Sequence, residues 1–369
     1  VKLPFEMGRV LAAGAELKNT FCLTRDRHAF VSQHIGDMEN LETLTHFEET
    51  VALYEQLFRA APDALACDPH PDYLTTRYAE ARAQRDGLPL HRVQHHHAHV
   101  AACLADNGWM PSDGPVIGVA MDGTGFGSDG RIWGGEFLLA DYRGFERFAH
   151  LEYAPLPGGD AAIHKPYRAA VAYLRHFLGE LPGLPFLAAV PPDEAEAVQR
   201  MAVSGLNTPL TSSAGRLFDV VGVLADGPLT ASYEAQVAME LEAMAGEVAD
   251  THGPSYPLPL ETQDGERVVR LAPLLAAVVR DVQAGQPSAA ISATFHRSLA
   301  TMIAQACEAV RAERGLVTVA LSGGCFQNRQ LLWLVVVALS ERGFRVLLHR
   351  QVPANDGGLS LGQAVVAHF

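Results

Sequence analysis

The densest group of potential metal ligands lies at residues 94–100, where four histidines occupy five consecutive positions. An apolar stretch precedes the group, and Asn107-Gly108 follows it. This order predicts a strand end that leads into a helix with a left-handed stop. In such a helix His95 and His99 are one turn apart, so their side chains share a face. Two imidazoles at this spacing commonly present two nitrogen ligands to one divalent ion.

Two simpler explanations of this group are an affinity-tag remnant and a solvated polar helix start. The run is internal and Ala98 interrupts it, which argues against a tag. Asp122 and Asp356 are the carboxylates best placed to complete a metal site, because each lies beside glycines at a predicted strand end. Taken alone, either aspartate is better explained as a turn residue that caps its own backbone. A His₂Asp₂ set would suit Fe(II) or Zn(II) and leave room for a substrate oxygen.

Three glycine-containing turns, at 14–18, 122–130 and 322–324, follow apolar segments that we predict as buried strands. Glycine lets backbone N–H groups approach an anion closely, as in phosphate-binding loops. A single turn of this kind often has only a geometric reason. Three in one chain favour a nucleotide, although the spacing fits neither a P-loop nor a GxGxxG turn. Cys325, beside the third turn, is a candidate nucleophile, but without a paired histidine in the sequence it is better interpreted as a buried thiol.

Length and composition set the broad class of the protein. A chain of 369 residues can form two domains or lobes, and its 48% hydrophobic and 19% charged residues are ordinary globular values. The net charge of −14 and the lack of a basic run argue against a nucleic-acid partner. No apolar run is long enough to span a membrane. Five scattered cysteines without CxxC spacing favour the reducing cytoplasm over a disulfide framework.

The predicted elements divide the chain at the Pro- and Gly-rich segment 111–115. Before it, residues 1–7 form a lead-in, and a strand–turn–strand unit at 9–23 and a third strand at 29–35 open a β-β-β-α-β-α series. That order is typical of a ribonuclease-H-like lobe. We therefore expect an N-terminal lobe at 1–112 and a C-terminal lobe at 113–357. The second would carry a helical insertion at about 157–315, which includes a helix at 233–252 and a hairpin of 256–258 with 268–270, and the final helix 358–369 would pack on the first lobe.

Over nearly its whole length the chain resembles the C-terminal carbamoyltransferase module of HypF, the hydrogenase-maturation protein. The matching stretches are 14–20, 32–37, 68–73, 94–99, 122–127, 157–160, 215–219 and the motifs that begin at Ser322 and Asn355. The resemblance implies an α/β fold of the ASKHA type, with two ribonuclease-H-like lobes and the active site in the cleft between them. It also implies relatives among tRNA threonylcarbamoyltransferases (TsaD-like) and O-carbamoyltransferases such as TobZ.

The resemblance also implies roles for individual residues. His95, His99, Asp122 and Asp356 would bind the metal. The nucleotide would contact Gly123, Thr124, Gly125, Asp219, Glu234, Gln236, Ser322, Gly323, Gly324 and Asn328. The carbamoyl or phosphate group would be held by Lys18, His164 and Arg168. At 233–236 the family usually has Tyr-Glu-Gly-Gln, whereas this chain has Tyr-Glu-Ala-Gln.

The activity implied is metal- and nucleotide-dependent transfer of a carbamoyl group to the C-terminal cysteine of HypE. The group would come from carbamoyl phosphate and ATP through carbamoyl adenylate, with Mg²⁺ as a further candidate ion, and would become the cyanide ligands of [NiFe] hydrogenase. The acylphosphatase-like, zinc-finger and YrdC-like modules of full-length HypF are absent from the sequence, so the chain is an excised module or a short form. The alternatives are a TsaD-like or TobZ-like transferase and a nucleotide-binding scaffold without turnover.

Overall fold

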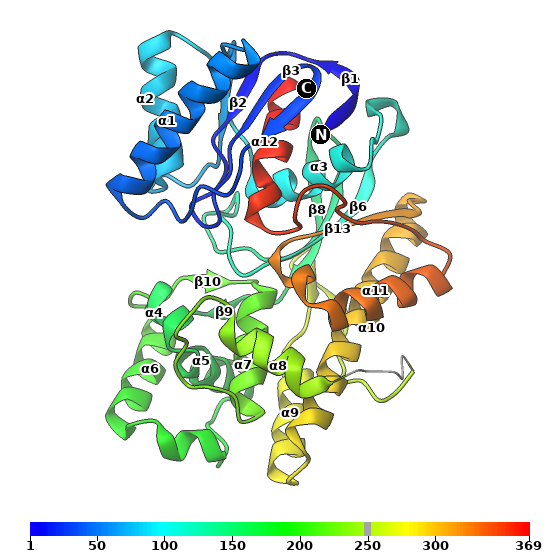
Figure 1. Cartoon of the computed structure of the whole chain (residues 1–369). Helices are drawn as coiled ribbons and strands as arrows, with labels where there is room; N and C mark the ends of the chain where they lie inside the picture. Colours follow the sequence, from blue (N-terminus) through cyan, green and yellow to red (C-terminus); the bar gives the residue numbers. More distant parts are fainter. Residues whose placement is uncertain (247–251) are drawn as a thin grey trace.

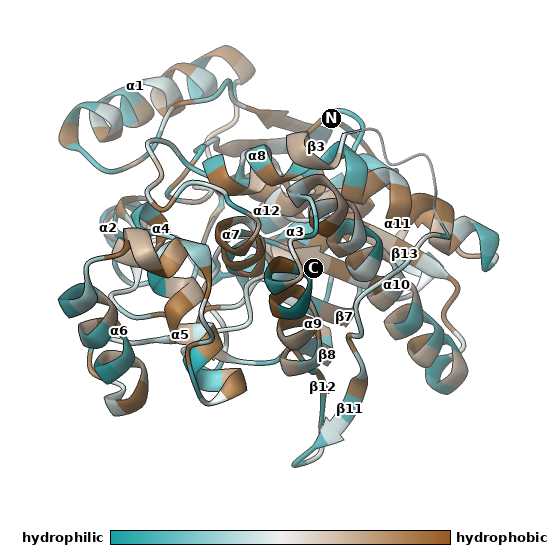
Figure 2. Cartoon of the chain, turned by 90° about the horizontal axis from the view of Figure 1, so that it is seen from below, coloured by the Kyte–Doolittle hydropathy of each residue, from teal (hydrophilic) through white to brown (hydrophobic). Residues whose placement is uncertain are grey.

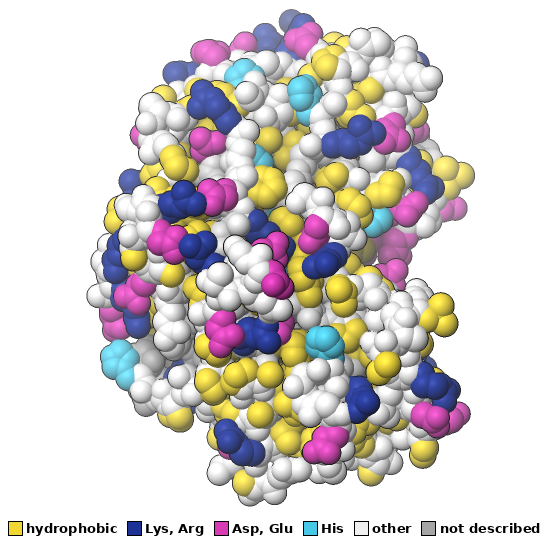
Figure 3. Space-filling view, turned by 180° about the vertical axis from the view of Figure 1, so that it is seen from behind, with side chains coloured by type: hydrophobic (Ala, Val, Ile, Leu, Met, Phe, Trp, Pro, Cys, Tyr) yellow, Lys and Arg dark blue, Asp and Glu magenta, His cyan; other side chains and the backbone are white. Residues whose placement is uncertain are grey.

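The computed structural model describes residues 1–246 and 252–369, which form two lobes (Figure 1). The upper lobe in that view contains both chain termini, and the lower part is mainly helical. Figure 3 shows one face, on which acidic and basic side chains are interspersed without an extended area of either sign. Within the described residues no helix combines the length and the apolar character needed to cross a membrane.

The first lobe is built on a five-stranded sheet with the order β1-β3-β2-β4-β5. Its strands are β1 (Lys2–Met7), β2 (Val10–Ala12), β3 (Cys22–Val31), β4 (Ala64–Cys67) and β5 (Leu90–Arg92). Its helices are α1 (Leu41–Phe58), α2 (Leu74–Asp86), α3 (His95–Asp106) and the final helix α12 (Leu359–His368). Three strands are paired antiparallel and the last two join in parallel, which is the ribonuclease-H-like pattern.

Two details of the first sheet correct the sequence prediction. The segment 1–7 is not a lead-in, because it forms the edge strand β1 and pairs antiparallel with β3. The second strand of the 9–23 unit and the third strand predicted at 29–35 are not separate, because residues 22–31 form one ten-residue strand, β3. Local pattern could not distinguish these arrangements, since an exposed polar stretch in the middle of β3, at 25–28, resembles a turn in sequence.

The second lobe repeats the pattern on a seven-stranded sheet with the order β11-β12-β8-β7-β6-β13-β14. Its strands are β6 (Val116–Met121), β7 (Gly135–Ala140), β8 (Phe145–Leu151), β11 (Leu260–Gln263), β12 (Glu266–Val269), β13 (Thr318–Ser322) and β14 (Arg345–Leu347). Strands β6, β7 and β8 are antiparallel, and β13 and β14 continue from β6 in parallel. The predicted hairpin is present, but its first strand is at 260–263 rather than 256–258.

The remaining helices belong to the second lobe, and most of them pack on one another rather than on its sheet. They are α4 (Asp160–His164), α5 (Tyr167–Leu178), α6 (Pro192–Ser204), α7 (Ala214–Leu224), α8 (Gln236–Ala245), α9 (Ala272–Gln283), α10 (Ser288–Arg314) and α11 (Arg329–Glu341), with a short pair β9 (Ala154–Pro155) and β10 (Leu210–Thr211). Short 3₁₀ turns are η1 (Pro111–Asp113), η2 (Pro185–Ala189), η3 (Gly324–Gln327) and η4 (Asp356–Gly358). Of the helix predicted at 233–252, α8 covers 236–245, and residues 247–251 lie outside the described residues. Figure 2 shows α7 as almost uniformly hydrophobic at the centre, whereas α6 is mixed at the periphery.

Helix α3 lies between the two lobes and packs against both of them. All twelve of its residues are buried, because one side packs on the second sheet and another on α12. Both contacts require glycine. A Cβ atom at Gly118 would lie 2.4 Å from a methyl of Val100, and one at Gly362 would lie 1.8 Å from the carbonyl oxygen of Ala98. The predicted α/β fold with two ribonuclease-H-like lobes is therefore confirmed, and the histidine helix is the element that connects them.

Candidate metal centre and adjoining cavity

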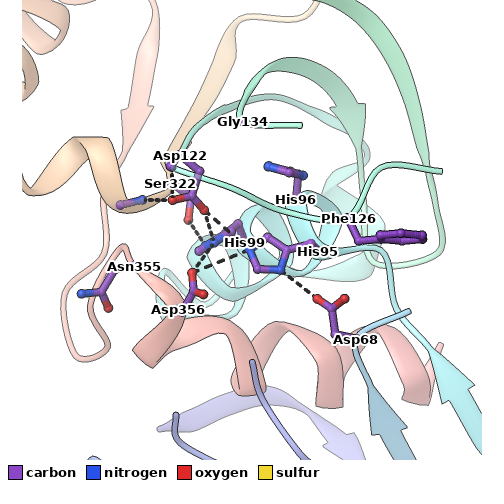
Figure 4. A network of polar contacts seen from close by, with 12 residues as sticks. Asp68, His95, His96, His99, Asp122, Phe126, Gly134, Ser322, Asn355 and Asp356 are labelled. Atoms are coloured by element: carbon purple, nitrogen blue, oxygen red, sulfur yellow. Dashed lines mark hydrogen bonds and ion pairs between the residues drawn. The ribbon is translucent and has the colours of Figure 1, made fainter. Parts of the chain in front are cut away.

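Four side chains from three separate segments converge at the beginning of α3 (Figure 4). His95 and His99 project from its first two turns, Asp122 directly follows β6, and Asp356 begins η4. The Nε2 atom of His99 lies 3.0 Å from Oδ2 of Asp122 and 3.4 Å from Oδ1 of Asp356. The Nε2 atom of His95 lies 3.6 Å from each of the same oxygens. All four ligand atoms are within 4.8 Å of one another.

The polar atoms of this cluster have the arrangement expected around a cation. Nε2 of His95, Nε2 of His99 and Oδ2 of Asp122 are buried without a hydrogen-bond partner among the described residues, so their close contacts lack hydrogen-bond geometry. Buried polar atoms are normally paired, and one divalent ion between them would satisfy all three. Two imidazole nitrogens and two carboxylates form a donor set that suits Zn(II) or Fe(II). The residues present therefore fit a metal ion.

The electrostatics of the cluster favour positive charge at the same point. Burial opposes protonation of His95, but the carboxylates of Asp356, Asp122 and Asp68 outweigh it and raise the pKa of His95 well above its ordinary value. Burial likewise opposes ionisation of Asp356, yet His95 and His99 lower the pKa of this carboxyl to about 2. The histidines likewise lower the pKa of Asp122, so the two carboxylates of the cluster stay ionised near neutral pH, which is the form that binds a metal.

Each ring is held in orientation by a hydrogen bond at Nδ1, on the side away from the cluster. Nδ1 of His95 lies 2.8 Å from Oδ2 of the fully buried Asp68. Nδ1 of His99 lies 3.3 Å from Oγ of Ser322, which lies 2.8 Å from Nε2 of His349. Such contacts select the tautomer that leaves Nε2 free for a metal. Sequence reasoning missed Asp68 and His349 as site residues, although Asp68 begins the matching stretch 68–73 and directly follows β4.

The glycine-rich turn after β6 packs directly on the histidines. A Cβ atom at Gly125 would lie 2.5 Å from Cε1 of His96 and 2.7 Å from Cδ2 of His95, so only glycine permits this approach. The side chain of Gln94 connects the turn to the helix, since its Nε2 donates to the carbonyl of Phe126 and its Oε1 accepts from the N–H of His97. Gly125 and Ser322, both predicted as phosphate contacts, thus also support the histidines.

A cavity of about 340 Å³ adjoins the cluster, with Asp122 and Asp356 in its wall. Seven further residues predicted for the site line it, namely Lys18, Gly123, Thr124, Asp219, Glu234, Gly324 and Asn328. Residues not predicted for the site also line it, among them Leu17, Arg216, Phe218, Met239, Glu242 and Cys325. Because Leu17 and Lys18 belong to the first lobe and α7 and α8 to the second, this cavity is the expected interlobe cleft.

Several polar groups in the cavity already have partners. The N–H groups of Gly123 and Gly324 both donate to Oδ1 of Asp122, at 2.8 and 3.1 Å, so they orient this carboxylate. Lys18 forms an ion pair with Glu234, which also lines the cavity. Asn328 caps α11 through Oδ1, and its Nδ2 lies 2.9 Å from Nε2 of His296.

Besides Gly125 and Ser322, four residues predicted to contact the nucleotide or the carbamoyl group do not line this cavity. The side chain of Gln236 accepts from the N–H of Ser232 and donates to Glu240. Gly323 turns with a φ of 99° against the backbone of Met121. His164 is exposed at the end of α4, and Arg168 donates from α5 to the carbonyl of Pro157. Of the three residues expected to hold the carbamoyl or phosphate group, Lys18 lines the cavity, and His164 and Arg168 do not.

Ala235 occupies the position at which the family pattern has glycine. Its φ of 58° lies in the left-handed region, where a Cβ atom is unfavourable and glycine is not. The Gly of the family's Tyr-Glu-Gly-Gln sequence thus has a conformational reason. Ala235 also N-caps α8 beside Glu234, so the strain is located in the cavity wall.

Comparisons with known proteins agree with this geometry. Residues 6–106 match the model of the HypF Kae1-like domain, and residues 118–363 match that of the second subdomain of the Kae1-like carbamoyltransferase domain. The chain belongs to the HypF carbamoyltransferase family. The resemblance inferred from the motifs is therefore confirmed.

Individual relatives show how much of a HypF protein the chain covers. It is 41% identical to carbamoyltransferase HypF of Rhodobacter capsulatus, over 97% of this chain and 46% of that protein. It is 40% identical to a HypF homolog of Cupriavidus necator, over 97% of this chain and 91% of that protein. A crystal structure of full-length HypF, in its phosphate- and nucleotide-bound form, superimposes with a TM-score of 0.92 at 38% identity, over all of this chain and 56% of that one. The chain spans about half the length of most HypF proteins it matches.

Proposed function

We propose that the chain is a metal- and nucleotide-dependent carbamoyltransferase of [NiFe]-hydrogenase maturation. The carbamoyl group would come from carbamoyl phosphate through carbamoyl adenylate, and the acceptor would be the C-terminal cysteine of HypE. The reaction would take place in the cytoplasm. Membership of the HypF family supports this assignment.

The observation that carries the proposal is the buried His₂Asp₂ cluster in the wall of a cavity between the lobes. A bound Fe(II) or Zn(II) ion would supply Lewis acidity toward the carbamoyl carbonyl or the adenylate phosphate. The cavity has about the size of a small-molecule site. A relative of similar fold was crystallised with phosphate and nucleotide, which supports a nucleotide here.

The chain's own residues position the reactants. Lys18 lines the cavity, where a cation favours the binding of an anionic donor. The amides of Gly123 and Gly324 hold Asp122 in one orientation, and Asp68 and Ser322 do the same for the two histidine rings. The acceptor sulfur would attack the carbamoyl carbon. As the new C–S bond forms, the bond from that carbon to the phosphate oxygen breaks, and AMP leaves with its electron pair.

The nucleophile is expected to come from the partner. Cys325 lines the cavity, but burial raises the pKa of its thiol well above the ordinary value, so the thiol stays protonated at neutral pH. The other four cysteines are free and buried. A transferase that relies on an acceptor thiolate needs no thiolate of its own.

The test is carbamoyl transfer to HypE, measured by mass spectrometry as the addition of one carbamoyl group to its C-terminal cysteine. One reaction would contain carbamoyl phosphate and ATP, and a second preformed carbamoyl adenylate. The His99→Ala variant removes one candidate metal ligand. The matched control is His91→Ala, since His91 is exposed on β5 and outside the cluster.

We expect transfer by the wild type and the control, and none by His99→Ala. Transfer from the adenylate alone would show that activation takes place on another module. Transfer from carbamoyl phosphate and ATP would show that this chain also activates the carbamoyl group. A metal-loaded wild type that transfers from neither donor would refute the carbamoyltransferase assignment.

A further inference from the structure

Arg216 is a buried cation that the reaction described above does not use. It lies in the first turn of α7, is 6% exposed and lines the cavity. Among the described residues in the cavity wall, only Lys18 and Arg216 are cationic. They face five carboxylates, those of Asp122, Asp219, Glu234, Glu242 and Asp356. An anionic ligand therefore has few groups in this cavity to neutralise it.

Three other groups that could meet a phosphate are already engaged. Lys18 is paired with Glu234, and the amides of Gly123 and Gly324 donate to Asp122. The guanidinium of Arg216 is different, because its Nε and Nη1 are buried without a hydrogen-bond acceptor among the described residues. Leaving charged donors buried and unpaired is costly, so their position requires an acceptor that enters the cavity.

The contact between Arg216 and Asp219 does not supply the missing hydrogen-bond acceptor. Nη1 of Arg216 lies 2.7 Å from Oδ2 of Asp219 on the next turn, but without hydrogen-bond geometry, and this oxygen is unpaired as well. Burial, only partly offset by Arg216, raises the pKa of Asp219 to about 6. Asp219 thus holds the guanidinium in place but does not satisfy its hydrogen-bond donors. A guanidinium has further donors for a second, phosphate-like partner.

The surroundings of the guanidinium also favour an anion. Its Nη2 lies 3.7 Å from the position that a Cβ atom of Gly123 would occupy, so it stands beside the turn that follows Asp122. Ser213 caps α7 and accepts from the N–H of Arg216, which places the guanidinium in the helix's first turn. The positive end of the helix dipole adds to the charge there.

We infer that Arg216 binds the phosphate of the nucleotide in this cavity, with Asp219 holding its guanidinium in position. The inference rests on the proposed function, which supplies the nucleotide. When the bond between the carbamoyl carbon and the phosphate oxygen breaks, the electron pair stays on that oxygen, and Arg216 is the cation that meets the added charge. It therefore contributes both to binding and to departure of AMP.

The test compares binding of AMP and adenosine by isothermal titration calorimetry. These two ligands differ only in the phosphate. The variants are Arg216→Gln, Arg216→Lys and Asp219→Asn. The matched control is Arg200→Gln, because Arg200 also pairs with a carboxylate one turn away on its own helix but is exposed on α6.

We expect Arg216→Gln to weaken AMP binding by about 10- to 100-fold and adenosine binding by less than about threefold. Arg216→Lys keeps the charge but loses the planar fork, so AMP binding should weaken by an intermediate factor. Asp219→Asn keeps Arg216 and should still prefer AMP to adenosine, and the control should match the wild type. If Arg216→Gln does not fold, Arg216→Lys decides.

Two results would overturn the inference while leaving the proposed function intact. One is unchanged AMP binding in the folded Arg216 variants, and the other is an equal loss for AMP and adenosine, which would indicate a purely structural role. A wild type that binds neither ligand would overturn both the nucleotide-dependent function and the role of Arg216.

Discussion

Replacing Asp68 with asparagine removes the negative charge behind His95 and leaves the size of the side chain unchanged. In the structure Asp68 is fully buried and uses both carboxylate oxygens. Oδ2 lies 2.8 Å from Nδ1 of His95, and Oδ1 accepts from the N–H of His70 at 2.9 Å. An asparagine has one oxygen for these two donors, so one N–H would face the amide NH₂. The variant therefore loses a charge-assisted hydrogen bond and gains a mismatch.

The magnitude follows from this loss. A buried hydrogen bond to a charged group contributes about 1.5–3 kcal/mol. Outer contacts of metal-bound histidines typically change metal affinity by about 10- to 100-fold, which corresponds to about 1.4–2.7 kcal/mol. Both estimates agree, so we expect Asp68→Asn to weaken Zn(II) binding by about 10- to 100-fold without unfolding the protein.

The assay is competition for Zn(II) between the protein and a chromophoric chelator of known affinity. The control is Asp72→Asn in the same loop, because the Asp72 side chain is 75% exposed and pairs with Arg77. Circular dichroism would establish that both variants are folded. An Asp68→Asn affinity within about threefold of the wild type, or an equal loss in the control, would refute the role of Asp68 in orienting His95.

Four further predictions concern stability. First, because three polar atoms of the His₂Asp₂ cluster lack partners, Zn(II) at about 100 times its Kd should stabilise the fold by about 2.7 kcal/mol; a Tm that neither rises with Zn(II) nor falls with a chelator would contradict this. Second, Gly362→Ala would place a Cβ atom 1.8 Å from the carbonyl oxygen of Ala98. It should lower the free energy of unfolding in urea by about 1–3 kcal/mol or more and weaken Zn(II) binding. Gly144→Ala is the control, because Gly144 has open space around it and its replacement should leave the free energy of unfolding unchanged. Third, burial lowers the pKa of His296 to about 4, whereas a histidine in the unfolded chain has a pKa of about 6.5. The stability that neutral His296 contributes is therefore complete above about pH 6.5 and is lost toward pH 4, where the free energy of unfolding is lower by up to about 3 kcal/mol. The free energy of unfolding of His296→Gln should fall less steeply over this pH range. Fourth, Ala235→Gly relieves a left-handed alanine and should raise the free energy of unfolding by up to about 1 kcal/mol, and a loss of stability would contradict the strain at this position.

The sequence alone determined the local elements that carry the site. The spacing of His95 and His99 predicted that both side chains share one helix face, and α3 begins at His95 with both rings directed at one point. Apolar runs followed by glycine turns predicted buried strands such as β6 and β13. These inferences succeed because helix and strand periodicity depend on residues close together in the chain. The motifs added the family and, through it, the fold.

The tertiary structure decided which partners each side chain meets. Sequence reasoning expected Gly125 and Ser322 at phosphates, and only the fold shows that Gly125 also packs on His95 and that Ser322 is hydrogen-bonded to His99. The N-terminal segment could not be identified as a strand, because an edge strand is defined by pairing with β3 rather than by its own pattern. The sequence placed Arg216 in the matching stretch 215–219 but gave it no role, since buried donors without a hydrogen-bond acceptor are recognised only when every neighbour is known. Burial and pairing depend on residues far apart in the chain, and only the folded molecule brings these together.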